Sequence, residues 1–173
     1  MRLFIAVRFE DKLIKALTDV QNALRERDFS GRFTRQQNLH MTLSFIGEYD
    51  DPDNVLQIMQ KLEAKPFTLK LCGRLGHFGD LLWAGAEQSD ELLAYVQKLR
   101  SVLDEGCVPH DRQPFVPHIT LLQRVRNMPD LSDITVAQES MTVQRIMLMR
   151  SDLSREDGGI YREIGSAEIG KAE

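Results

Sequence analysis

Two short stretches of the sequence share one pattern, an apolar run that begins with His-x-Thr: HMTLSFIG at residues 40–47 and HITLLQRV at residues 118–125. Side chains at positions i and i+2 of a β-strand point to the same face, so Thr42 would project together with His40. In the second stretch, Thr120 would project together with His118. A strand meant only for a core would carry valine or isoleucine here, because buried polar groups without partners are unfavourable. The pattern therefore predicts two strands that each present an imidazole and a hydroxyl to one surface.

The length and composition are those of a soluble globular protein. A chain of 173 residues can bury one substantial core, which predicts a single bilobal domain over residues 1–173. No apolar run approaches the roughly 20 residues needed to cross a bilayer. The start of the chain, MRLFIAVRFEDK, reaches acidic residues before any site that resembles a signal-peptide cleavage site. We therefore expect a cytoplasmic protein with no membrane association.

The formal net charge of −4 argues against a long polyanion as the partner. Neutralising many phosphates requires a large basic footprint, whereas a small phosphate or one end of a nucleic acid does not. Four arginines nevertheless crowd the approach to the first motif: Arg25, Arg27, Arg32 and Arg35. They would form either the rim of a substrate site or a solvated surface.

Hydrophobic periodicity and turn residues predict a mixed order of strands and helices. Besides the two motif strands, strands are expected at 2–8, 67–75, 81–87, 141–153 and 159–169, with a turn at Gly158 and Gly159. Helices are expected at 11–27, at about 54–64 and at 89–106. Because strands and helices do not alternate regularly, the predicted class is α+β. A strand, a helix and His-x-Thr follow one another twice, which suggests two related, pseudo-symmetric lobes that face one another.

Two imidazoles and two hydroxyls that face each other suit a displacement at phosphorus. Histidine titrates near neutrality, so one ring can hold a proton while the other lacks one. General acid and general base catalysis then contribute about 10²- to 10⁴-fold each. Threonine hydroxyls can donate hydrogen bonds to the non-bridging phosphate oxygens. This chemistry requires no cofactor.

A metal site is the main alternative, because histidine is a common metal ligand. Zinc takes three or four protein ligands, and the two strands offer neither a carboxylate nor a third histidine on the predicted face. We therefore expect no metal. A serine nucleophile is a weaker alternative, because Ser44 shares the face of His40 by parity but lacks the surrounding nucleophile-elbow pattern.

Three segments, in order, resemble the two-histidine phosphoesterases, and specifically the bacterial RNA 2',3'-cyclic phosphodiesterases once called 2'-5' RNA ligases: RLFIAV, GRFTRQQNLHMTLSFIGE and FVPHITLLQRV. The resemblance implies a bilobal α+β fold with helices outside and a cleft between two antiparallel sheets. It also implies metal-independent opening of a 2',3'-cyclic phosphate to a 2'-phosphomonoester, with RNA ends or small cyclic nucleotides as substrates.

By the same resemblance, His40 is similar to the proton donor that protonates the departing 3' oxygen. His118 is similar to the proton acceptor that activates water, while Thr42 and Thr120 would hold the phosphate oxygens. The residues alone leave open which histidine is the donor. They also leave open a binding module without turnover, and reversible 2'-5' ligation of RNA ends. The physiological substrate and the oligomeric state are not addressed by the sequence.

One position departs from the family pattern. Family members commonly carry an arginine five positions after the second motif histidine, where this chain has Gln123 followed by Arg124. If the strand stays regular, Arg124 shares a face with His118 and Thr120 and could bind the substrate phosphate. The alternative for Arg124 is an exposed surface arginine.

Overall fold

In the computed structural model, which describes residues 1–152 and 159–170, the strands and helices expected from the sequence are present in order, with one unexpected strand at residues 30–33, where the sequence predicts a loop around Gly31. The elements are β1 (Arg2–Val7), α1 (Asp11–Arg25), β2 (Ser30–Phe33), the 3-10 turn η1 (Gln36–Asn38), β3 (Met41–Glu48), α2 (Pro52–Lys61), β4 (Phe67–Phe78), β5 (Leu81–Ala86), α3 (Asp90–Glu105), β6 (His118–Arg126), β7 (Ser140–Val143), β8 (Arg145–Asp152) and β9 (Ile160–Glu168).

The helices begin where capping residues allow. Ser89 accepts a hydrogen bond at Oγ from the Leu92 amide (3.2 Å), and α3 ends before Gly106 as predicted. The second helix begins earlier than expected, at Pro52 rather than near residue 54, and it ends at Lys61. There the Asp51 carboxylate accepts a hydrogen bond from the Asn54 amide (3.1 Å), and a proline is well tolerated in the first turn. The acidic turn that ends the first motif strand therefore caps this helix directly.

The strands form two antiparallel sheets, which confirms the α+β class. One sheet has the order β3-β1-β8-β9, and the other has the order β2-β6-β5-β4-β7. The strand predicted over 141–153 is wrong in one respect, because it divides at Gln144 into β7 and β8, which belong to different sheets. Of the turn predicted at Gly158 and Gly159, Gly158 lies outside the described residues, and Gly159, with φ +97°, directly precedes β9.

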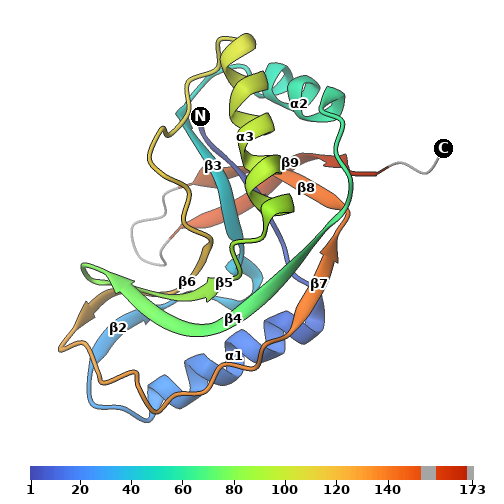
Figure 1. Cartoon of the computed structure of the whole chain (residues 1–173). Helices are drawn as coiled ribbons and strands as arrows, with labels where there is room; N and C mark the ends of the chain where they lie inside the picture. Colours follow the sequence, from blue (N-terminus) through green and yellow to red (C-terminus); the bar gives the residue numbers. More distant parts are fainter. Residues whose placement is uncertain (153–158, 171–173) are drawn as a thin grey trace.

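The two sheets are not built from consecutive halves of the chain. Strands β1 and β3 form one sheet with the C-terminal β8 and β9, in which β1 pairs with β8, whereas β2, which lies between β1 and β3 in sequence, pairs with β6 in the other sheet. In Figure 1, α1 lies beside the five-stranded sheet, and α2 and α3 lie together at the other end of the molecule, where α2 contacts β9 and α3 contacts β3 and β4. The two lobes thus exchange segments.

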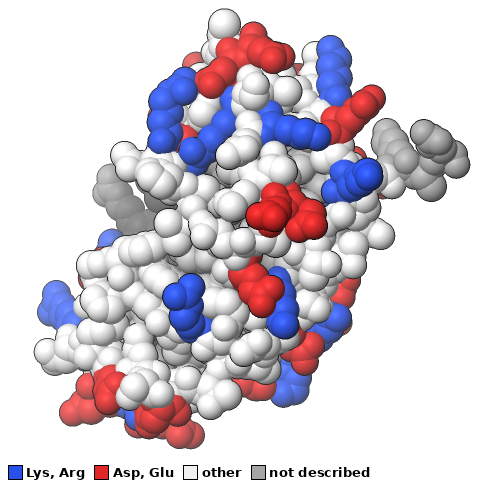
Figure 2. All heavy atoms as spheres, viewed as in Figure 1, with Lys and Arg blue, Asp and Glu red and all other residues white. Residues whose placement is uncertain are grey.

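The surface carries charges of both signs in alternation. On the face shown in Figure 2, lysine and arginine are interspersed with aspartate and glutamate, with uncharged surface between them. This distribution agrees with the small net charge and gives that face no continuous basic track for a long nucleic acid.

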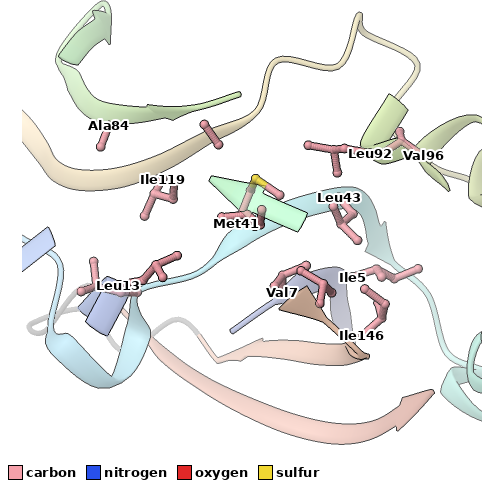
Figure 3. Close-up of a cluster of buried hydrophobic side chains, with 14 of the residues drawn as sticks. Ile5, Val7, Leu13, Met41, Leu43, Ala84, Leu92, Val96, Ile119 and Ile146 are labelled. Carbon is pink, nitrogen blue, oxygen red and sulfur yellow. The ribbon is translucent and has the colours of Figure 1, made fainter. Parts of the chain in front are cut away.

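One buried hydrophobic cluster connects both sheets. It contains Ile5 and Ile146 of the four-stranded sheet together with Ala84 and Ile119 of the five-stranded sheet (Figure 3). Met41, directly after the first motif histidine, also belongs to it and is fully buried. Burial of these alternate residues places the intervening motif side chains on the opposite face of their strands.

Candidate active site

The two motif histidines have the same hydrogen-bonding geometry at the start of their strands, and β3 contacts β6. His40 immediately precedes β3, and its Nδ1 lies 2.7 Å from the carbonyl oxygen of Asn38. His118 is the first residue of β6, and its Nδ1 lies 2.7 Å from the carbonyl oxygen of Val116. A carbonyl oxygen only accepts, so Nδ1 donates in both rings. In the neutral form of each ring, Nε2 therefore carries the lone pair and can accept a hydrogen bond.

The first imidazole is enclosed by aromatic side chains. The ring centroid of His40 lies 5.0 Å from that of Phe4 and 5.2 Å from that of Tyr161, which meets it edge-on. Its Nε2 lies 3.1 Å from Oγ of Thr42, and with the proton on Nδ1 the hydroxyl donates to Nε2.

This enclosure affects the proton affinity of the first imidazole. Burial lowers the pKa of His40, the hydrogen bond to Asn38 opposes this shift, and the positive charges of Arg8 and His118 lower the pKa further. Arg8 is held nearby because its guanidinium donates to the carbonyl oxygen of Gln37. His118 acts on His40 electrostatically, which means that the structure brings the two predicted motifs to one place.

The second imidazole has more open surroundings. His118 is partly exposed, and its ring lies 5.2 Å from Phe78 and 6.3 Å from Trp83 between centroids. In the pairing of β5 with β6, His118 lies opposite Gly85 and Thr120 lies opposite Trp83. Both imidazoles are therefore partly exposed, and each lies near two aromatic rings.

Both motif strands lose their alternation directly after the threonine. Leu43 is followed by a buried Ser44 in β3, and Leu121 is followed by a buried Leu122 in β6. At the same points the pairing of β3 with β1 and of β6 with β5 shifts register, as at a β-bulge. From the fourth residue after the histidine onward, side chains that would point outward in a regular strand therefore point inward, and the reverse.

This shift corrects two predictions that relied on regular strands. Ser44 does not share the face of His40, because it is only 3% exposed and its hydroxyl makes no hydrogen bond to a described residue. The condition that placed Arg124 beside His118 is also not met. Arg124 has a left-handed backbone with φ +54°, and its side chain is exposed. Gln123 is the residue that turns inward, toward Asn38 and Tyr161.

The four arginines near the first motif fall into two pairs. Arg25 lies over the ring of Phe33, with Cζ 4.2 Å from the ring centroid, and Arg27 forms an ion pair with Asp133 (2.9 Å). The other two, Arg32 and Arg35, line a small depression together with Asn38, Gln123 and Tyr161. Only the second pair is placed at the rim of the site.

A buried glutamine supports the site from α1. Gln21 is 2% exposed, and its Nε2 donates to the carbonyl oxygens of Thr34 (2.9 Å) and Leu121 (3.1 Å). These contacts join α1 to the segment that precedes the first motif and to β6. The sequence patterns did not single out Gln21, although its place between Leu17 and Leu24 on the apolar stripe was a usable signal.

Two absences concern the described part of the chain. Residues 1–152 and 159–170 contain no group of three or more His, Cys, Asp or Glu side chains that could hold a metal ion. None of the helices among these residues is long and apolar enough to cross a membrane.

The fold and the site define a class: α+β proteins in which two antiparallel sheets bring two strand-borne imidazoles to one place. The chain belongs to the 2'-5' RNA ligase superfamily, whose family model matches residues 9–155.

Relatives of known name agree with this membership. The chain is 28% identical to the RNA 2',3'-cyclic phosphodiesterase of Thermotoga maritima, over 94% of this chain and 92% of that protein. The structure of TT0787 from Thermus thermophilus is similar with a TM-score of 0.85 and 27% identity, and the match covers 97% of each chain. Escherichia coli LigT complexed with 3'-AMP has a TM-score of 0.82 at 22% identity, covering 98% of each chain, which shows the shared fold.

Proposed function

We propose that this protein hydrolyses 2',3'-cyclic phosphates, at RNA ends or on small nucleotides, to 2'-phosphomonoesters. The observation that carries the proposal is the pair of imidazoles, His40 and His118, which lie at the starts of the contacting strands β3 and β6 and share the same Nδ1–H···O=C geometry. The family supports the same chemistry, because several relatives are RNA 2',3'-cyclic phosphodiesterases.

In the proposed reaction, Nε2 of His118 takes a proton from a water molecule, whose oxygen attacks phosphorus. The bond between phosphorus and the 3' oxygen breaks, and His40 gives its Nε2 proton to that oxygen. The 2' ester bond remains, so the product is a 2'-phosphomonoester. Thr42 and Thr120 donate hydrogen bonds to the non-bridging oxygens and hold phosphorus between the rings.

The donor role requires a protonated His40, although burial lowers its pKa in the free protein. A cyclic phosphate carries a negative charge, and this charge raises the pKa of a histidine that it approaches. Protonation of His40 and substrate binding are therefore coupled. On protonation, Nε2–H becomes a donor, and the Thr42 hydroxyl is released to bind the phosphate.

The direct test uses 2',3'-cyclic AMP with wild type, His40→Ala and His118→Ala. Each variant should lose at least about 10²-fold in kcat/KM, the size expected for loss of one acid or base catalyst. Phosphorus NMR of the product should show a 2'-phosphate, and EDTA should not change the rate. Unaltered turnover in either variant contradicts the mechanism, and binding without any product identifies a binding module instead.

Ligation is a second candidate, favoured by the name of the superfamily. It uses the same groups in the same roles: His118 takes the proton of a 5'-hydroxyl RNA end, which attacks phosphorus in place of water, and His40 protonates the departing 3' oxygen. Because the 2' ester bond remains, a 2'-5' linkage forms. Incubation of two RNA fragments, one with a 2',3'-cyclic phosphate and one with a 5'-hydroxyl, tests this reaction. A 2'-5' joined product that His40→Ala and His118→Ala fail to form would establish it.

A further inference from the structure

A second depression opens beside His118. It has a volume of about 530 Å³ and is lined by residues of β4, β5 and the segment before β6, among them Arg74, Trp83, Gly85, Val116 and Pro117. We call it the Trp83 depression. Val116 also accepts the hydrogen bond from His118 Nδ1, and the Trp83 ring lies 6.3 Å from the His118 ring. The depression therefore continues directly from the second motif.

Two glycines allow the indole of Trp83 to lie flat on the sheet. Gly76 lies opposite Trp83 in the pairing of β4 with β5, and a Cβ at Gly76 would be 2.4 Å from Cζ2 and 2.5 Å from Cη2 of the indole. A Cβ at Gly85 would be 3.3 Å from Cζ3. The ring thus covers the space that side chains at both positions would need.

One face of the indole is consequently packed against the sheet. Nε1 is buried and makes no hydrogen bond to a described residue, which agrees with a ring pressed onto the strands. The Phe78 ring is tilted against the indole, with 5.2 Å between centroids. The indole also lines the depression, so the part of the ring exposed there can contact a ligand. A buried polar atom without a partner is unfavourable, and this position is therefore poorly explained by stability alone.

A flat aromatic surface next to a phosphate site matches the chemistry of a nucleotide. Every nucleobase has an aromatic face, and stacking on tryptophan tolerates any base. The charges around the depression also suit an anionic nucleotide. Arg74 at its edge is exposed and makes no ion pair with a described residue, whereas the negative charge of Glu87 is paired with Lys70 (3.8 Å).

We propose that Trp83 is the stacking platform for the base of the nucleotide whose cyclic phosphate is held between His40 and His118. This inference rests on the proposed function, because it assumes that the phosphate of a nucleotide binds between the histidines. It assigns Trp83 a role in substrate binding rather than in proton transfer, and it implies little discrimination among the four bases.

The chain offers a direct probe, because Trp83 is its only tryptophan. Titration of the wild type with 2'-AMP, the expected product, should quench Trp83 fluorescence as adenine stacks on the indole. Inorganic phosphate, which lacks a base, should compete for the site without the same quenching. Quenching by 2'-AMP in a protein that never opens a cyclic phosphate would retain the platform and reject the proposed function.

A kinetic comparison tests the role in catalysis. The substrates are 2',3'-cyclic AMP and the 2,3-cyclic phosphate of methyl β-ribofuranoside, which has no base. Trp83→Leu should lower the preference for cyclic AMP by about tenfold or more, mainly through KM, because one base–aromatic stack is lost. Trp83→Phe retains an aromatic ring and should keep much of the preference. A misfolded variant would instead lose activity on both substrates together. In that case the fluorescence titration of the wild type tests the proposal.

Phe45→Leu is the matched control. Phe45 is 48% exposed, lies on β3 of the other sheet, and does not line the Trp83 depression. Phe78 is unsuitable, because its ring lies 5.2 Å from the Trp83 ring between centroids. This variant should keep the preference for cyclic AMP over the base-free substrate, whatever its kcat. The proposal is overturned if cyclic AMP is hydrolysed, 2'-AMP leaves Trp83 fluorescence unchanged, and Trp83→Leu keeps the wild-type preference.

Discussion

At the scale of single residues, both imidazoles have the Nδ1 hydrogen bond to a carbonyl oxygen two residues earlier, whereas the hydrogen bond between Nε2 and the motif threonine is found for His40 and not for His118 among the described residues. His40 lies near Phe4 and Tyr161, His118 lies near Phe78 and Trp83, and both imidazoles are partly exposed. Burial lowers the pKa of His40, which opposes a donor role in the free protein. The assignment of His40 as donor therefore follows from the family resemblance and requires the charge of the bound phosphate to raise that pKa.

The donor assignment predicts a dependence on the leaving group. Bis(4-nitrophenyl) phosphate releases 4-nitrophenolate, which departs without protonation, so this substrate needs a base but no acid. His40→Ala should lose at least about 10²-fold in kcat/KM on 2',3'-cyclic AMP and far less on the nitrophenyl diester. His118→Ala should be impaired on both. If His118→Ala is the variant rescued by the good leaving group, the two roles are exchanged.

The lowered pKa of His40 also predicts how stability depends on pH. Unfolding returns the pKa of His40 to its ordinary value of 6.5, so below that pH the unfolded chain binds the proton more readily than the folded one. The contribution of the neutral ring is present above about pH 6.5 and is lost as the pH falls below it. His40→Gln should therefore lose less thermal stability than wild type between about pH 6.5 and pH 5.

Melting temperatures measured across this range test the prediction. His77→Gln serves as the control, because His77 is exposed and its Nδ1 lies 3.1 Å from the carbonyl oxygen of Gly79 in a surface turn. If the curves of melting temperature against pH are parallel for wild type and His40→Gln, the imidazole of His40 contributes nothing to the loss of thermal stability at low pH.

At the scale of elements, α1 is joined to the site by Gln21. Gln21→Leu removes the amide that donates to the carbonyl oxygens of Thr34 and Leu121. The partly buried carbonyl oxygen of Thr34 is then left without this partner. The free energy of unfolding should fall by about 1–3 kcal/mol. Urea denaturation measures it, and Asn22→Ala, on the exposed side of the same helix, should change it by less than about 0.5 kcal/mol. Equal effects of both substitutions would mean that the hydrogen bonds of Gln21 do not contribute measurably to the free energy of unfolding.

The motif strands show how far a sequence can predict a site. The alternation of side chains along a strand correctly placed His40 on the same face as Thr42, because both precede the bulge in β3. The same rule failed for Ser44 and Arg124, which follow the bulges in β3 and β6. A bulge depends on how a strand pairs with a distant partner, and no local pattern in either motif marks it. Residue patterns therefore predicted which side chains share a face at the start of each strand but not beyond the bulge.

The same limit applies to whole elements. Helix positions followed from caps and apolar stripes that lie within a few residues, and they were predicted well. The division of the segment 141–153 at Gln144 was not predicted. It arises because β7 pairs with β4 in one sheet and β8 pairs with β1 in the other. Which sheet a strand joins is decided by long-range pairing rather than by its own composition.

At the scale of the whole molecule, the exchange of segments couples the two lobes. The N-terminal and C-terminal strands share one sheet, β2 crosses to the other, and a single buried cluster contains residues of both. Neither sheet can lose its order without exposing apolar surface of the other. The relative position of His40 and His118 therefore depends on the whole fold rather than on a hinge between independent lobes.

This coupling predicts one cooperative unfolding transition. Trp83 reports on the five-stranded sheet, and far-UV circular dichroism reports on the whole chain, so both signals should give the same urea midpoint. Ile5→Ala, a fully buried change in the four-stranded sheet, should destabilise the protein by about 2–5 kcal/mol. The Trp83 transition should move by the same amount as the dichroism, although Trp83 lies in the other sheet. If the Trp83 midpoint stays in place while the dichroism shifts, the sheets unfold separately, and the geometry between the two imidazoles is not fixed by a shared core.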